Sequence, residues 1–143
     1  MILPDINVLL YAFREEHPHH GLHRAWLQGA LGGPEPVGLP LQVLAGFVRV
    51  VTHPRVYDPP TSMADALDFV RAVREAPASV SVEPSDRCAL VFDELCRRSG
   101  VKGSQVSDAY LAAVAIDGGC TLVTADRGFA RFPGLRWRHP LDA

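Results

Sequence analysis

The sequence predicts an α/β protein built around a parallel sheet. Short apolar runs of the kind found in buried strands alternate along the chain with segments whose apolar residues recur at helical spacing. Such alternation favours right-handed crossovers, and these place neighbouring strands parallel to one another. No internal repeat and no linker-like stretch interrupts the 143 residues. We therefore expect one domain that spans residues 1–143.

The first half of the chain opens with a short apolar strand followed directly by a helix. The strand covers residues 1–3, and Asn7, a residue type that favours helix starts, opens the helix. Helices in this half are expected over residues 7–13, 19–31 and 41–51. The proline-bounded run at residues 36–40 fits a second strand, although a loop fits it too. The helix at residues 41–51 is apolar on nearly all sides, so we expect it to be buried or covered by a partner.

The second half of the chain repeats the alternation. Ser62, with Asp65 three residues later, is a typical helix start. Helices are expected over residues 62–76, 85–99 and 104–117, with a short turn or helix at residues 127–132. Strands are expected over residues 79–83 and 121–124, with an edge strand at residues 135–138.

Composition limits the functions that the chain can have. The net charge of −2 argues against a protein that coats nucleic acid by bulk charge, although it leaves room for local basic patches. Cys88, Cys96 and Cys120 are odd in number and lack the spacing of a metal or redox motif, which fits free thiols in a reducing compartment. No apolar run approaches the ~20 residues of a membrane span. We expect a cytoplasmic protein with no membrane partner.

Three acids are predicted to meet at one edge of the sheet. Asp5 follows the first strand, Asp108 lies near the start of a helix, and Asp126 follows a later strand. From Asp108 the helix runs about 15 Å away from this edge at about 1.5 Å per residue, and the next strand returns about 16 Å at about 3.3 Å per residue. Three converging carboxylates repel one another unless a divalent cation neutralises them, which indicates an oxygen-ligand Mg²⁺ or Mn²⁺ site. The competing interpretation is that Asp5 caps a helix and the other two acids are ordinary surface residues.

Motifs around these acids resemble a known family. The motifs are Asp5-Ile6-Asn7 after the first strand, Ser107-Asp108-Ala109 at the start of an alanine-rich helix, and Thr124-Ala125-Asp126-Arg127 followed by Phe129. In this order and spacing they resemble a PIN domain of the VapC toxin type, over nearly the whole chain. The resemblance implies a three-layer α/β/α fold with a central parallel sheet of four to five strands.

The resemblance also assigns roles to residues. It implies metal-binding, catalytic acids at Asp5, Asp108 and Asp126. It implies supporting polar residues at Asn7, Ser107 and Thr124. The activity that it implies is a Mg²⁺- or Mn²⁺-dependent endoribonuclease, the toxin of a type II toxin–antitoxin system. Its expected partners are an RNA substrate, a cognate VapB-like antitoxin and a second copy of the chain in a homodimer.

Two positions depart from the family pattern. Many relatives have Glu where Gly46 stands and an acid where Gly128 stands. The site is therefore expected to hold three carboxylates where relatives hold four or five, and one tightly held metal is favoured over two. Gly46 has a second interpretation, which is that a neighbouring segment packs closely against it.

Basic and histidine-rich segments offer further candidate contacts. Four arginines in the last 17 residues, Arg127, Arg131, Arg136 and Arg138, could bind RNA phosphates or form a solvated basic surface. His19 and His23 are one helical turn apart, but no Cys or acid stands at matching spacing, so a solvated helix start is favoured over zinc.

Three other functions compete with the nuclease. A haloacid-dehalogenase-like phosphatase would have a second Asp where Asn7 stands, and a receiver domain would need a lysine near its acids, whereas Lys102 is the only lysine. A PIN-like fold that binds RNA or protein with weak or no catalysis remains open because of Gly46 and Gly128.

Overall fold

The computed structural model describes residues 1–142 and shows a five-stranded, entirely parallel sheet in the order β3-β2-β1-β4-β5. The strands are β1 (Ile2–Pro4), β2 (Val37–Pro40), β3 (Ser79–Val82), β4 (Thr121–Val123) and β5 (Trp137–Arg138). The helices are α1 (Ile6–Phe13), α2 (His20–Leu31), α3 (Leu41–Val51), α4 (Met63–Glu75), α5 (Arg87–Ser99), α6 (Gln105–Asp117) and the short 3₁₀ helix η1 (Arg127–Arg131).

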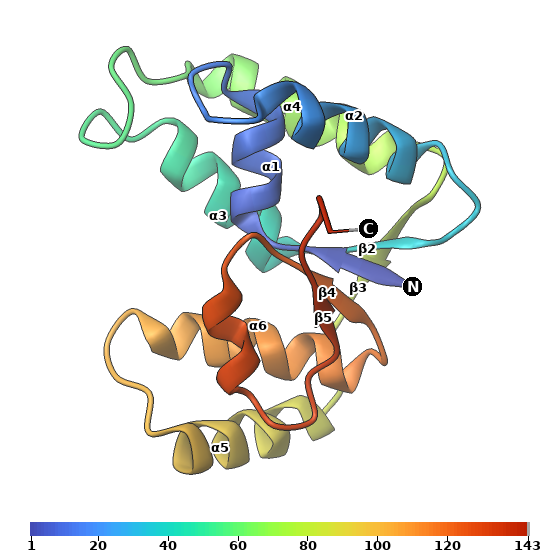
Figure 1. The fold of residues 1–143 in the computed structure, drawn as a ribbon, viewed down its shortest axis with the longest axis vertical. Helices are drawn as coiled ribbons and strands as arrows, with labels where there is room; N and C mark the ends of the chain where they lie inside the picture. The colour runs from blue at the N-terminus through green and yellow to red at the C-terminus, as the bar shows by residue number, and fades with distance from the viewer. Residues whose placement is uncertain (143) are drawn as a thin grey trace.

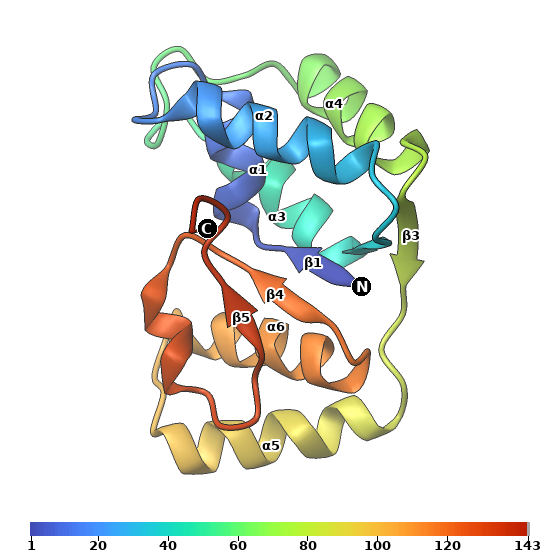
Figure 2. The same cartoon turned by 45° about the vertical axis from the view of Figure 1, so that its right-hand side comes forward.

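Helices cover both faces of this sheet. Helices α1 to α4 lie on one side of the strands, and α5 and α6 lie on the other, as the two views show (Figure 1 and Figure 2). This arrangement confirms the three-layer α/β/α fold and the upper end of the expected strand number. Because both faces are covered, the central strands β1, β2 and β4 are largely apolar rather than alternating.

The proline-bounded run at residues 36–40 is a strand. Every residue of β2 is buried, and β2 pairs with β1 on one side and β3 on the other. The N–H of Val37 donates to the carbonyl of Ala78, at 2.8 Å. Two prolines are tolerated at the ends of this segment because ladder hydrogen bonds are needed mainly between them.

Helix ends differ from the predictions by one or two residues, with local causes. Helix α1 begins at Ile6, one residue before Asn7, because Asp5 is its cap. Helix α5 begins at Arg87 rather than at Ser85, whose N–H instead donates to a carboxylate oxygen of Asp117 at 2.7 Å. The cap at Ser62 is confirmed, since its hydroxyl accepts the N–H of Asp65 at 3.1 Å.

The apolar surface of α3 is largely covered by the protein's own fold. Val43, Leu44, Phe47 and Val51 are buried, so of the two expected alternatives, burial and a covering partner, burial accounts for these side chains. The large apolar side chains left exposed on α3 and α4 are Leu41, Met63 and Leu67. The three cysteines are free thiols, as predicted. Within residues 1–142 no helix has the length and apolar character needed to cross a membrane.

Candidate active site

Asp5 is fixed at the carboxyl edge of the sheet by its own backbone. It follows β1 directly, and its N–H donates to the carbonyl of Val123 in the neighbouring strand β4, at 2.9 Å. Its side chain turns back to cap α1, where one carboxylate oxygen accepts the N–H of Ile6 at 2.7 Å. The capping role and a site role therefore coexist in this residue, because a carboxylate has further lone pairs to offer.

Thr124 and Asn7 hold the second oxygen of this carboxylate. Thr124, which is wholly buried, donates its hydroxyl proton to Asp5 Oδ2 at 2.7 Å, and Asn7 donates its amide to the same oxygen at 2.8 Å. Asn7 also donates to Thr124 Oγ1 and accepts the N–H of Ala125, both at 3.1 Å. These contacts join the start of α1 to the segment after β4, although the two are more than a hundred residues apart in sequence.

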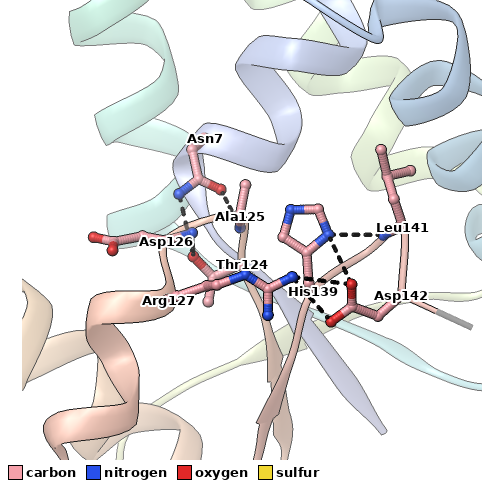
Figure 3. A network of polar contacts seen from close by, with 8 residues as sticks. All are labelled: Asn7, Thr124, Ala125, Asp126, Arg127, His139, Leu141 and Asp142. Carbon is pink, nitrogen blue, oxygen red and sulfur yellow. Dashed lines mark hydrogen bonds and ion pairs between the residues drawn. The ribbon is translucent and has the colours of Figure 1, made fainter.

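Asp126 belongs to the same network through its backbone. Its N–H donates to Thr124 Oγ1 at 3.0 Å, and its carboxylate caps η1 by accepting the N–H of Gly128 at 2.7 Å. The side chain of Asp126 is exposed and points away from that of Arg127 (Figure 3). Asp126 therefore stands at the sheet edge where Asp5 lies, with a carboxylate that faces outward.

Asp108 reaches this edge from helix α6. It lies in the first turn of α6, and the rest of α6 runs along the sheet to the start of β4. This path agrees with the helix and strand lengths expected from the sequence. Its side chain is half-buried. The charge of Asp126 acts on Asp108, and the charges of both act on Asp5. The three acids thus share one electrostatic environment.

Burial dominates the electrostatics of this site. It raises the pKa of Asp5 from 3.8 to about 6, with the charges of Asp108 and Asp126 adding to the rise and the hydrogen bonds from Thr124 and Ile6 opposing it. Burial also raises the pKa of Asp108, and the charge of Asp126 raises it further, while nearby Arg131 lowers it. Raised pKa values mean that the ionised carboxylates are destabilised here, so the site favours binding of a cation that neutralises them.

The three carboxylates are ligands that suit a hard divalent cation, although their side chains are too far apart to bind one ion together. Among residues 1–142, no three His, Cys, Asp or Glu side chains lie close enough to hold a metal ion together. The carboxylate oxygens of Asp5, Asp108 and Asp126 are the ligands that Mg²⁺ and Mn²⁺ prefer. Asp126 is exposed and Asp108 only half-buried, so neither side chain is locked by packing, whereas hydrogen bonds hold the carboxylate of Asp5 in place.

Two residues expected near the acids make other contacts. The hydroxyl of Ser107 is exposed and donates to the carbonyl of Ser104 at 2.7 Å, within the first turn of α6. Gly46 faces Ile6, and a Cβ at position 46 would overlap the Cδ1 atom of Ile6. The close-packing interpretation of Gly46 therefore has direct support, with a side chain of α1 as the neighbour.

A turn near the C-terminus brings Asp142 to the active-site edge, which the sequence did not reveal. Arg127 forms an ion pair with Asp142 at 3.1 Å, and the N–H of Leu141 donates to Nδ1 of His139 at the same distance (Figure 3). The only available signal was that Asp142 is the sole acid among the last 17 residues.

The histidine-rich segment makes ordinary structural contacts. His17 Nε2 hydrogen-bonds the hydroxyl of Tyr57 at 2.7 Å, and His20 Nδ1 hydrogen-bonds the carbonyl of Tyr11 at 2.9 Å. His23 is buried. Within the described residues these rings belong to no group of three His, Cys, Asp or Glu side chains that could hold a metal ion.

Comparison with known proteins identifies the family. The PIN domain family model matches residues 2–135. Ribonuclease VapC43 of Mycobacterium tuberculosis is 46% identical over 142 residues, which cover 99% of this chain and 97% of that protein. Ribonuclease VapC25 of the same organism is 37% identical over 140 residues, which cover 98% and 99% of the two chains.

Solved structures share the fold at lower identity. A crystal structure of VapBC2 from Rickettsia felis bound to a DNA fragment from their promoter superposes with a TM-score of 0.70 at 20% identity, covering 97% of this chain and 98% of that one. The crystal structure of Mycobacterium tuberculosis VapC20, a sarcin-ricin loop cleaving toxin, gives a TM-score of 0.65 at 17% identity, covering 95% and 99%. The chain belongs to the PIN-domain family and, within that family, to the VapC ribonucleases.

Proposed function

We propose that this protein is an endoribonuclease toxin that needs Mg²⁺ or Mn²⁺ and is neutralised by a VapB-like antitoxin. The single observation that carries the catalytic part is the buried, desolvated carboxylate of Asp5 at the sheet edge, whose charge interacts with those of Asp108 and Asp126. An arrangement of this kind is unfavourable in isolation, and a divalent cation relieves it. Membership of the VapC ribonucleases supports RNA as the substrate.

Each residue has a distinct part in this proposal. Asp5, Asp108 and Asp126 would hold the cation, which when bound supplies Lewis-acid activation of the phosphodiester and of the attacking water. Thr124 and Asn7 orient the Asp5 carboxylate through their two donated hydrogen bonds. A carboxylate oxygen left free of the cation can accept the proton that the attacking water loses.

The antitoxin is proposed to bind the apolar groove between α1, α2 and α4. This groove has a volume of about 410 Å³, and its apolar lining includes Phe13, Leu27, Leu31, Phe69 and Val73. Complexes named VapBC among the solved structures support an antitoxin partner. The exposed Leu41, Met63 and Leu67 are the proposed surface for a second copy of the chain. Sizing of the protein alone and after co-expression with the adjacent small protein tests both partners.

A binding module without catalysis is the second candidate function. It is favoured by one observation, that the three acids do not form a metal-holding group in residues 1–142. The two candidates differ in whether the purified protein cleaves RNA.

Cleavage of single-stranded RNA by purified protein decides between them. The proposal expects cleavage in Mg²⁺ or Mn²⁺ that stops when EDTA is added, and its loss in Asp108→Asn and Asp126→Asn, because an amide keeps the shape but removes the anionic oxygen. Asp93→Asn, which removes an exposed carboxylate on α5, is the matched control and should cleave normally. Wild-type protein that binds RNA but never cleaves it would establish the binding module instead.

A further inference from the structure

The four arginines of the C-terminal segment differ in what they already bind. Arg127 is paired with Asp142, and Arg138 lies 3.6 Å from Glu35. Arg136 donates to the carbonyl of Gly119, at the edge of the sheet opposite the acids. Arg127 therefore lies at the active-site edge but is already paired with a carboxylate, whereas Arg136 and Arg138 have partners elsewhere.

Arg131 is placed differently. Its side chain is exposed, its Nε donates to the carbonyl of Gly128 at 2.8 Å, and no carboxylate of residues 1–142 lies within 4.0 Å of its guanidinium. Its positive charge nevertheless acts on Asp108, so the guanidinium is close enough to influence the site without being paired in it. The remaining guanidinium N–H groups are available to an anionic ligand.

Gly128 makes room for this guanidinium. A Cβ at position 128 would lie 2.8 Å from Nη2 of Arg131 and 2.8 Å from Oδ1 of Asp126, closer than atoms of this kind pack. The backbone of Gly128 does not adopt the left-handed conformation that favours glycine, so a side chain here would act by displacing these two side-chain ends. Arg131 Nη2 and Asp126 Oδ1 therefore both border the space that a side chain at position 128 would take, without forming an ion pair with each other.

From this geometry we propose that Arg131 is a catalytic residue, which binds the RNA phosphate at the cleavage position. The inference deepens the proposed function and rests on it. A guanidinium offers paired, fixed donors that match phosphate oxygens, and its carbonyl contact to Gly128 holds the fork in one orientation. Once a cation neutralises the acids, they no longer attract Arg131, and the phosphate becomes its strongest partner.

Arg131 also supplies positive charge. A site with only three acids is expected to hold one cation rather than two, so it has less positive charge of its own to offer the substrate. Hydrolysis of a phosphodiester builds negative charge on the phosphate oxygens, and a positioned guanidinium stabilises that charge more than it stabilises the bound substrate. Arg131 should therefore affect kcat as well as RNA affinity. It should weaken affinity for the cation, since like charges beside one another repel.

The test compares Arg131→Gln with Arg136→Gln, since each change removes one exposed arginine that donates to a single carbonyl. RNA affinity is measured in Mn²⁺ with a single-stranded phosphorothioate oligoribonucleotide, which resists cleavage. Arg131→Gln should weaken binding roughly tenfold and lower the slope of log K against log salt concentration by ~0.7, the value for one phosphate contact on a single strand. It should lower kcat/KM on ordinary RNA by about 100-fold and tighten Mn²⁺ binding in calorimetry.

Two further variants separate the role of Arg131 from a structural one. Gly128→Ala keeps Arg131 but places a methyl group against its guanidinium and against the Asp126 carboxylate. It should weaken RNA binding like Arg131→Gln without weakening Mn²⁺ binding in calorimetry, whereas a loss that acts through Asp126 would weaken both. The double variant should bind RNA no more weakly than Arg131→Gln. Arg136→Gln should keep wild-type affinity and salt slope. Wild-type affinity, salt slope and kcat/KM in Arg131→Gln would overturn the inference while leaving the nuclease assignment intact. Wild-type protein that never cleaves RNA would instead refute the proposed function.

Discussion

Replacing Asp5 with asparagine should make the metal-free protein more stable above pH 6. Burial raises the pKa of Asp5 from 3.8 to about 6, so the folded state prefers the neutral form. A shift of about two units, at ~1.36 kcal/mol each, means that ionised Asp5 destabilises the fold by about 3 kcal/mol. Because the folded-state pKa lies above the unfolded one, this penalty is complete above about pH 6 and is relieved as the pH falls toward 3.8.

The expected change in the free energy of unfolding follows from these two pKa values and from one lost hydrogen bond. An asparagine at position 5 can still accept from Thr124 and Asn7 with its single oxygen, but its amide then faces the N–H of Ile6, which costs about 1 kcal/mol. At pH 8 the net gain in the free energy of unfolding should be about 2 kcal/mol. At pH 4.5 the penalty on the wild type has fallen to about 1 kcal/mol, so the two proteins should be nearly equal.

Urea unfolding in EDTA at both pH values measures this difference. Asp93→Asn is the control, because the Asp93 side chain is exposed and its change should not gain stability at pH 8. In excess Mn²⁺ the order at pH 8 should reverse, since only the wild type keeps the full set of acids. An Asp5→Asn protein that is less stable than the wild type by the same amount at pH 8 and at pH 4.5 would refute the reasoning.

Three other substitutions test packing and hydrogen bonding around the site. Gly46→Ala should lower stability by about 1–2 kcal/mol, because overpacking against Ile6 outweighs the gain in helix propensity. Ile6→Val removes the overlapping Cδ1, so the double variant should be about 1 kcal/mol more stable than additivity predicts, and additive effects in urea unfolding would count against the contact. Thr124→Val should lower stability by about 1–3 kcal/mol and raise the pKa of Asp5 further, since the hydroxyl bond holds that pKa down. An unchanged titration of Asp5 by NMR would exclude this role of Thr124.

Sequence reasoning placed the architecture well because the relevant signals are local. Strand and helix periods, glycine stops and the cap at Ser62 each depend on a few neighbouring residues, and all appear in the structure. Helix and strand lengths then placed Asp108 and Asp126 at the edge that holds Asp5. The length of the helix after Asp108 nearly equals the length of the strand before Asp126, so the chain returns to the same edge of the sheet.

What the sequence could not predict depends on side chains that meet from distant segments. The contact between Ile6 and Gly46 joins two helices, and nothing near either residue indicates the other. The ion pair of Arg127 with Asp142 needs the turn His139–Asp142, and although Pro140 favours a turn there, nothing in the sequence indicates which distant side chain Asp142 meets. The different partners of Arg131 and Arg136 likewise depend on where each side chain ends, which spacing alone does not determine.

The hydrogen bond from the N–H of Asp5 to the carbonyl of Val123 has a consequence for how the site closes. It anchors Asp5 to the carboxyl end of β4, between two paired inner strands of the sheet. Asp126, by contrast, sits at the start of a five-residue 3₁₀ helix, an element that rearranges easily. The acids therefore differ in backbone setting, with Asp5 held by sheet pairing and Asp126 by the cap of a short helix. Closure on an incoming ligand can proceed by small movements of η1 toward an Asp5 that stays still.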